Sequence, residues 1–154
     1  MGIHPATKGL DLPALGEPEQ VIHSGRGVSR VAVLGADFPG LKPTLRVAVG
    51  DMVKRGQPLF EDAARPGVLH TAPGGGRIAA INLTASGELV SVVIELSDAE
   101  SAEQQSFASF RGKPIPALSR DDVRAILLES GLWTAFRTRP FGRTPAAGEV
   151  PDAI

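Results

Sequence analysis

The chain contains no cysteine. Disulfide bonds, zinc–thiolate sites, iron–sulfur clusters and thiol nucleophiles are therefore excluded within these 154 residues. No stretch approaches the ~20 apolar residues that a membrane-spanning helix requires, and residues 1–13 lack the apolar centre of a signal peptide. A formal net charge of -1 gives no overall field that would attract nucleic acid or acidic lipid. We therefore expect a soluble chain that does not bind nucleic acid and that reaches a membrane only by docking on another protein.

Turn-forming residues are abundant. The 18 glycines and 13 prolines make up about a fifth of the chain, against roughly 12% in average proteins. Hydrophobic residues at 42% and charged residues at 21% are typical of a globular protein. This composition favours short strands joined by many turns over long helices.

Two stretches of similar pattern lie at the centre of the chain, residues 47–59 and 72–81. In the first, apolar residues are interrupted twice by a glycine with a polar partner, at Gly50-Asp51 and Gly56-Gln57. Glycine supplies the positive φ that tight turns need, and aspartate braces such turns by local hydrogen bonds. In the second, a turn precedes an apolar strand. The two units predict a mainly β fold, a small flattened barrel or sandwich.

Apolar alternation and turn residues predict six strands, at residues 28–34, 44–49, 57–61, 68–71, 77–83 and 89–96. The last is the clearest and is expected to be central in its sheet. One face is expected to carry Val90, Val92, Ile94 and Leu96, and the other Ser91 and Glu95. Residues 1–27 are expected to be extended or irregular.

The composition divides the chain into a β domain at 1–98, a linker at 99–118 and a second unit at 119–154. The second unit opens with a helix that Ser119 caps, with Asp121 and Asp122 in its first turn and an end at Gly131. An apolar face at Val123, Ile126 and Leu127, together with the aromatic residues after it, needs a partner to pack against. We expect the start of a second domain that is truncated soon after its first helix; the alternative is a helix that packs back on the β domain.

The central pattern is shared with biotinyl and lipoyl carrier domains, which present one lysine at the tip of a hairpin. The corresponding hairpin here, residues 60–71, contains no lysine. Arg65 cannot replace it, because a guanidinium group does not form the amide bond to the cofactor. The scaffold therefore resembles a carrier without its attachment chemistry.

Four other groups of residues could carry chemistry, and for each the plainer interpretation is favoured. The three histidines lack metal-site spacing and are expected at the surface or in loops. The two neighbouring carboxylates lie on a strand, where they point to opposite faces and make a poor acid–base pair. They are expected to mark a solvated strand end. The glycine run leads into a strand, so a plain turn is favoured over a phosphate-binding loop. The arginine cluster is interpreted as a solvated face in preference to an anion site or a subunit surface. These groups are, in order, His4, His23 and His70; Glu61 and Asp62; Gly74, Gly75, Gly76 and Arg77; and Arg137, Arg139 and Arg143.

A specific combination of short segments extends from Lys8 to Phe141. It comprises Lys8-Gly9-Leu10-Asp11-Leu12-Pro13, Asp37-Phe38-Pro39-Gly40, Val49-Gly50-Asp51, Gly56-Gln57-Pro58-Leu59-Phe60-Glu61-Asp62, Thr71-Ala72-Pro73, Leu127-Leu128-Glu129-Ser130-Gly131-Leu132-Trp133-Thr134-Ala135 and Arg137-Thr138-Arg139-Pro140-Phe141. In these segments the sequence resembles the N-terminal part of the A subunit of the bacterial Na+-translocating NADH:quinone oxidoreductase.

This resemblance implies a barrel-sandwich hybrid domain followed by a Rossmann-like α/β domain. It implies a peripheral subunit on the cytoplasmic face of the inner membrane, docked on the integral membrane subunits. The complex uses NADH, flavins, iron–sulfur centres, ubiquinone and Na+, whereas this subunit is expected to bind no cofactor. The family is associated with quinone, which makes ubiquinone a further candidate partner. No motif transfers a quinone-binding residue, and we assign no catalytic, cofactor-binding or metal-binding residue.

Two alternatives remain open at the level of sequence. The central glycine–aspartate stretch is also similar to the C subunit of the Rnf electron-transfer complex, whose cluster-binding cysteine motifs would follow Ile154. A free-standing carrier-like binding module is the other. A true carrier predicts covalent modification, which an intact mass would detect, and the absence of the hairpin lysine counts against it; without modification it would be a lysine-less binding module.

Overall fold

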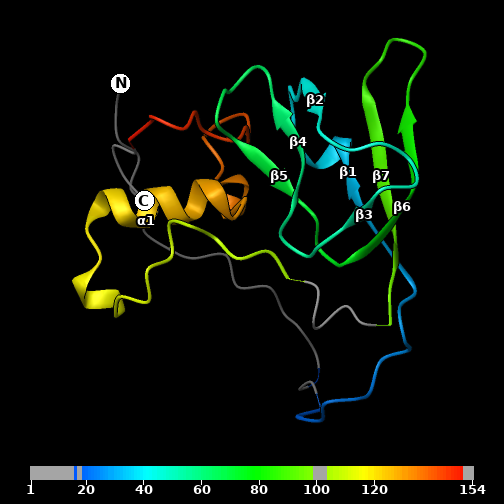
Figure 1. The fold of residues 1–154 in the computed structure, drawn as a ribbon, viewed down its shortest axis with the longest axis horizontal. Helices are drawn as coiled ribbons and strands as arrows, with labels where there is room; N and C mark the ends of the chain where they lie inside the picture. The colour runs from blue at the N-terminus through cyan, green and yellow to red at the C-terminus, as the bar shows by residue number, and fades with distance from the viewer. Residues whose placement is uncertain (1–15, 17–18, 99–103, 151–154) are drawn as a thin grey trace.

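The computed structural model describes residues 16, 19–98 and 104–150 (Figure 1). Seven strands and one α-helix form its regular structure, with three short 3-10 helices between them. The strands are β1 (Arg30–Leu34), β2 (Pro43–Leu45), β3 (Met52–Val53), β4 (Pro58–Asp62), β5 (Leu69–Thr71), β6 (Gly76–Leu83) and β7 (Leu89–Leu96). The helices are η1 (Gly35–Asp37), η2 (Ile115–Ala117), α1 (Arg120–Glu129) and η3 (Leu132–Ala135). The prediction of a mainly β fold is confirmed.

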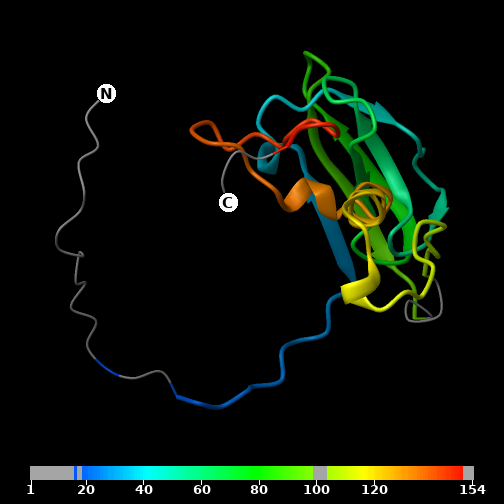
Figure 2. The same ribbon diagram turned by 90° about the vertical axis from the view of Figure 1, so that its left-hand side faces the viewer.

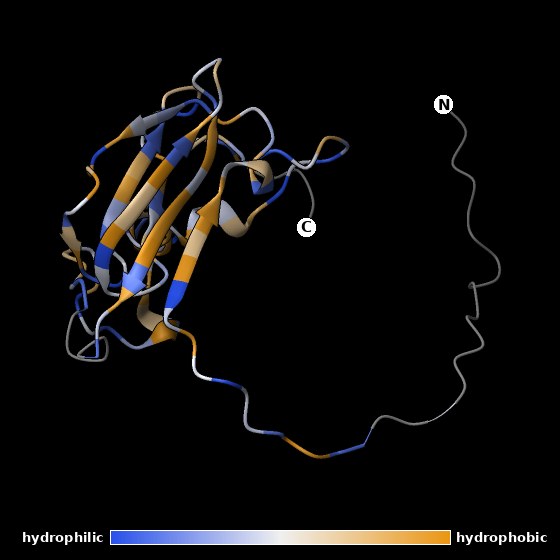
Figure 3. Ribbon diagram, turned by 90° about the vertical axis from the view of Figure 1, so that its right-hand side faces the viewer, coloured by the Kyte–Doolittle hydropathy of each residue, from blue (hydrophilic) through white to orange (hydrophobic). Residues whose placement is uncertain are grey.

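The strands form two antiparallel sheets, one ordered β1-β7-β6-β3 and the other β2-β4-β5. Polar and apolar residues alternate along the longer strands (Figure 3). Their inward-facing apolar residues meet in one core with contributions from both sheets, which consists of Val53, Leu59, Phe60, Ala72, Ile78, Leu89, Val92 and Ile94. The core therefore forms as in a sandwich, by burying one face of each sheet against the other.

The expected strand at residues 44–49 is wrong beyond Leu45, where β2 ends. The Asp51 carboxylate accepts a hydrogen bond of 2.8 Å from the Ala48 amide, and the Asp51 amide donates to the Ala48 carbonyl. This local turn competes with ladder pairing. The chain then re-enters a sheet at the two-residue strand β3, which the sequence pattern did not predict.

The central position of β7 is confirmed, but the expected side-chain faces are wrong at its start. Val90 is 48% exposed, whereas Ser91 is 7% exposed. Leu83 pairs with Leu89 and Asn82 pairs with Ser91, so Val90 is an additional residue in the ladder. Such a β-bulge reverses the alternation of side chains before it.

Helix α1 begins as predicted. The Ser119 hydroxyl accepts a hydrogen bond from the Asp122 amide, and the Asp122 carboxylate accepts one from the Ser119 amide, which is a capping box. Gly131 follows the helix in the left-handed conformation, with φ of 79°. The expected apolar face is only partly covered, because Val123 is 40% exposed.

The helical segment lies against one side of the β structure, next to β5 (Figures 1 and 2). Residues 104–118, expected to be linker, also make contacts: the Gln105 amide donates to the Arg55 carbonyl, and the Glu129 carboxylate accepts from the Ala108 and Ser109 amides. The domain boundaries at 98 and 118 stay a prediction, and most of residues 1–18 lies outside the described ranges. Within those ranges, every helix is too short or too polar to cross a membrane.

Candidate functional site: the β4–β5 hairpin and the β5 junction

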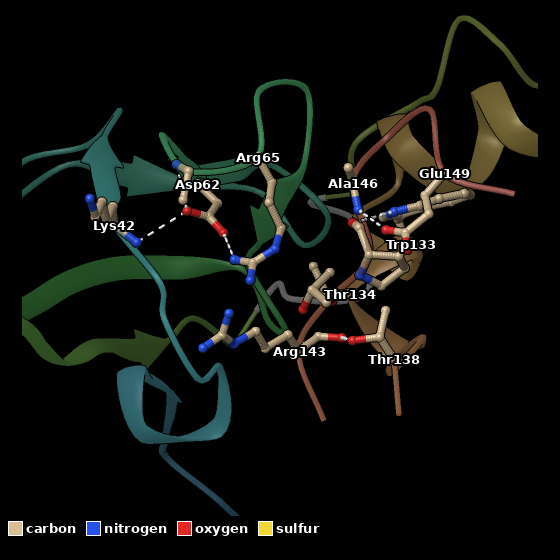
Figure 4. Close-up of polar contacts among 12 residues, drawn as sticks. Lys42, Asp62, Arg65, Trp133, Thr134, Thr138, Arg143, Ala146 and Glu149 are labelled. Atoms are coloured by element: carbon tan, nitrogen blue, oxygen red, sulfur yellow. Dashed lines mark hydrogen bonds and ion pairs between the residues drawn. The ribbon is translucent and has the colours of Figure 1, made fainter. Parts of the chain in front are cut away.

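The hairpin between β4 and β5 is the one that the sequence resemblance to carrier domains indicates as the lysine-bearing hairpin. The Arg65 amide donates to the Asp62 carbonyl and the Val68 amide donates to the Arg65 carbonyl, which closes two tight turns in succession. The Asp62 carboxylate accepts hydrogen bonds from the amides of Lys42 at 3.1 Å and Ala64 at 3.0 Å (Figure 4). The hairpin is therefore held from within by one carboxylate.

Arg65 completes this arrangement. Its Nη1 lies 2.6 Å from Oδ2 of Asp62, and the two side chains are 14% and 2% exposed. Burial alone would raise the pKa of Asp62, but the hydrogen bonds from Lys42, Arg65 and Ala64 outweigh it and hold the pKa below its usual value. Arg65 is thus folded back on the hairpin and does not extend from its tip.

Glu61 is also engaged in the hairpin. It forms an ion pair with Arg46, and its Oε1 accepts a hydrogen bond of 2.8 Å from the Gly67 amide. The Gly67 amide, followed by Arg46, lowers the pKa of Glu61. The expectation of a solvated strand end is wrong for Asp62, which is 1% exposed. Both carboxylates are ionised structural groups, which is an unsuitable state for a general acid at neutral pH.

The prediction of a surface or loop histidine is wrong for His70, which lies on β5 and is 3% exposed. Its ring stacks on Phe60 with centroids 4.6 Å apart, and it meets the ring of Phe38 edge-on at 4.4 Å. The Nδ1 atom has no hydrogen-bond partner. Burial is the main cause that lowers the pKa of His70 to about 4; the Asp62 charge opposes this shift, and the Arg137 and Arg65 charges add to it. His70 is therefore neutral at pH 7.

The other histidines do not join this one. His23 is exposed, and His4 lies outside the described residues. In the described part of the chain, no three side chains of His, Cys, Asp or Glu gather as metal ligands.

The structure divides the three arginines of the predicted cluster. Arg137 is bound to the protein itself: Nη1 donates to the Thr134 carbonyl at 2.6 Å and to the Thr144 hydroxyl at 2.9 Å, and Nη2 donates to the Asp37 carbonyl at 3.2 Å. Its guanidinium carbon lies 5.2 Å from the centre of the Phe38 ring. Arg137 therefore joins η3 to η1. All three arginines are exposed, as the expectation of a solvated face requires.

A second junction connects the helical segment to β5. The Thr71 hydroxyl donates to the Ser130 carbonyl at 3.0 Å. Gly131 is buried beside it, and a Cβ atom there would lie 2.6 Å from the Thr71 hydroxyl oxygen. Trp133 is 8% exposed and donates from its indole nitrogen to the Pro145 carbonyl at 3.0 Å (Figure 4). The segment after η3 thus supplies the hydrogen-bond acceptor of the buried tryptophan.

The glycine run serves close packing between strands. Gly74, Gly75 and Gly76 are buried, and a Cβ atom at Gly76 would lie 2.0 Å from the Glu95 carbonyl oxygen of β7. Gly75 accepts a hydrogen bond from the Ser97 amide. These contacts agree with the structural interpretation of the run, since its backbone faces β7.

Sequence reasoning missed three features of this region: the Asp62–Arg65 pair, the ring stack of His70 and the role of Arg137. A weak signal existed for the first, because Asp and Arg three residues apart in a turn can pair. The other two depend on contacts between residues far apart in the sequence, which no local pattern contains.

Comparisons with known proteins give two matches to family models. Residues 5–97 match the "NqrA N-terminal barrel-sandwich hybrid domain", and residues 118–154 match the "NqrA second alpha/beta domain". The first agrees with the two packed sheets described above and confirms the predicted barrel-sandwich hybrid.

Several curated proteins are similar over nearly the whole chain. The A subunit of the Na(+)-translocating NADH-quinone reductase of Histophilus somni (strain 129Pt) is 49% identical over 147 residues, which is 96% of this chain. The proteins of the same description from Glaesserella parasuis serovar 5 (strain SH0165) and Haemophilus influenzae (strain PittGG) are 49% and 50% identical over the same share. The chain spans 32% of the length of each of these relatives.

Proposed function

The chain belongs to the NqrA family, and on that premise we propose that it forms the N-terminal part of the A subunit of a Na+-translocating NADH-quinone reductase. The observation that carries this proposal is the 49% identity over 96% of the chain to a relative of that description. Identity at this level extends through both segments matched by the family models. The identity also favours this assignment over an Rnf-type C subunit, because the resemblance of this chain to that protein was limited to the central glycine–aspartate stretch.

Within such a complex, we assign this segment a structural and docking role. The hairpin geometry supports this role, because Arg65 is folded on Asp62 where a carrier needs an extended, acylated lysine. The ionised carboxylates Glu61 and Asp62 and the neutral His70 are bound up in packing and hydrogen bonds. We therefore propose that no catalytic residue and no bound cofactor belong to this segment.

The partners we propose are the other subunits of the reductase, above all its integral membrane subunits, at the cytoplasmic face of the inner membrane. Ubiquinone is the small-molecule candidate. NADH, flavins, iron–sulfur centres and Na+ would act elsewhere in the complex. The absence of cysteine from this chain supports that assignment for iron–sulfur centres, which need thiolate ligands.

The test is affinity purification of the full-length protein from detergent-solubilised bacterial membranes, without overexpressed partners. We expect the remaining subunits of the reductase to co-elute with it, together with NADH-driven quinone reduction. Elution without these partners, under conditions that keep them soluble, would contradict the proposal. An intact mass above that of the sequence would support the covalently modified carrier-like module instead.

A further inference from the structure

One short loop of the helical segment is rigid and extends away from the body of the molecule. It comprises residues 138–143. The Thr138 amide donates to the Arg143 carbonyl and the Gly142 amide to the Thr138 carbonyl, both at 2.8 Å. The Thr138 hydroxyl donates to the same Arg143 carbonyl at 3.1 Å (Figure 4). In Figure 2 this loop, in orange-red, projects beyond the sheets and α1.

The base of the loop is fixed to the β structure. Arg137, the residue before it, binds the Asp37 carbonyl and stacks near the Phe38 ring. On the other side, the buried Thr144 accepts a hydrogen bond from Arg137. A loop held at both ends and closed internally loses little conformational entropy when it binds a partner.

The loop carries an aromatic side chain that the described residues do not cover. Phe141 is 73% exposed. The guanidinium carbon of Arg143 lies 5.7 Å from the centre of its ring. Exposed aromatic residues combined with arginine, on a rigid support, are the composition of interface hot spots.

The charge around Phe141 has one sign. Residues 137–143 contain three arginines and no acidic residue. The position that a Cβ atom would take on Gly40 lies 3.9 Å from Nη2 of Arg65 and 4.0 Å from Nε of Arg143, so two cations converge there. In the described part of the chain, neither Arg139 nor Arg143 forms an ion pair with a carboxylate. A complementary surface must therefore supply negative charge.

We infer that loop 138–143 is a docking element that inserts Phe141 into an apolar pocket, rimmed by Asp or Glu, on another protein of the assembly. This inference rests on the proposed function, since it names a contact within the same complex. Guanidinium groups recognise carboxylates through paired hydrogen bonds, which a rigid loop can align. A lipid surface fits less well, because one aromatic side chain beside a cation contributes too little apolar burial to hold a protein on a membrane.

The first test is photo-cross-linking in the purified complex that contains the full-length protein. Phe141→p-benzoylphenylalanine keeps an aromatic ring at the loop tip, and Phe110→p-benzoylphenylalanine provides the control, because Phe110 is 62% exposed on a different segment. We expect position 141 to cross-link to a peptide of another subunit that contains Asp or Glu. A cross-link to lipid, a cross-link to another part of the same subunit, or no protein cross-link in a fully assembled complex would overturn the inference.

The second test compares two matched double variants. Phe141→Ala with Arg139→Gln should reduce retention of the partner subunits about tenfold or more. Phe110→Ala with Arg111→Gln, another exposed Phe and Arg, should change it less than about twofold. Unchanged retention in the first variant overturns the docking loop while leaving the proposed function intact. Failure of the unaltered protein to co-purify with its partners would instead overturn both.

Discussion

At the scale of single residues, Asp62 determines the conformation of the β4–β5 hairpin. One nearly inaccessible carboxylate holds two backbone amides and the Arg65 guanidinium. A buried charge is tolerated only when hydrogen bonds and an opposite charge compensate for its lost hydration. The same network takes Arg65 largely out of solvent and makes it part of the framework of the hairpin.

Replacement of Asp62 tests this arrangement. Asp62→Asn keeps the size of the side chain but leaves the Arg65 charge without its partner. Breaking fully buried pairs costs ~3–5 kcal/mol; we expect about 2 kcal/mol here, because Arg65 is 14% exposed. Chemical denaturation measures the change. Asp98→Asn, at an exposed aspartate, should change the free energy of unfolding by less than ~0.5 kcal/mol, and equal effects of the two would contradict the assignment.

His70 makes stability depend on pH. Its pKa in the folded protein is about 4, below the unfolded value of 6.5. The unfolded state therefore binds more protons between these values, so the free energy of unfolding falls as pH falls through this window and is unaffected above it. The full difference between the folded and unfolded pKa values corresponds to about 3 kcal/mol in the free energy of unfolding. Asp62 remains ionised in the window, because its pKa is held below 3.8.

The variant His70→Phe retains a ring between Phe60 and Phe38 but cannot accept a proton. Between pH 7 and pH 4, the unfolding free energy of the unaltered protein should fall by about 3 kcal/mol more than that of the variant. His23→Gln, at an exposed histidine, is the control variant for the loss of a histidine elsewhere in the chain. Parallel pH profiles for the unaltered protein and His70→Phe would show that His70 is not buried in its neutral form.

Much of the residue-scale picture could not be predicted from the sequence. The absence of lysine from the hairpin could be predicted directly, because it needs only the position of the turn. The burial of His70 could not, since β5 has only three residues and gives no alternation to interpret. The role of Arg137 depends on Phe38 and Asp37, which lie in a distant part of the chain.

At the scale of elements, the junction between α1 and β5 depends on a close approach at Gly131. Its φ of 79° disfavours any residue with a Cβ atom, and Thr71 leaves no space for one. Two independent causes, backbone conformation and contact, thus require glycine at this position.

Gly142 allows these causes to be separated, because it has φ of 62° but no atom within 4 Å of a Cβ position. Gly142→Ala should cost about 1 kcal/mol from backbone strain alone. Gly131→Ala should cost at least ~1 kcal/mol more, through displacement of Thr71 and loss of its hydrogen bond to Ser130. Urea denaturation with hydrogen exchange of α1 measures both. Equal costs would show that the helical segment does not rest on β5.

Elements with strong local signals were predictable, and those governed by pairing were not. The residues of β7 and the capped start of α1 follow directly from apolar alternation and from Ser119. The bulge at Val90 is set by the register of β7 against β6, which alternation within one strand cannot reveal. β3 is two residues long and exists because Val53 joins the core beside Ile78.

At the scale of the whole molecule, a carrier-like sandwich is combined with a helical segment that presents a rigid, basic, aromatic loop. The hairpin that would carry a cofactor is closed by Asp62 and Arg65. The loop on the other segment is open and uncovered at Phe141. This distribution agrees with the structural and docking role proposed above.

The central claim is that this chain belongs to a working Na+-translocating NADH-quinone reductase as a non-carrier subunit. The most direct measurement is Na+-stimulated NADH-driven quinone reduction in membranes from cells that lack the full-length gene. We predict that this activity is lost, and that both the full-length protein and a version with all four of its lysines in this segment replaced by arginine restore it; these are Lys8, Lys42, Lys54 and Lys113. Unchanged activity in the deletion strain, or assembly without activity in the lysine-free version, would contradict the account.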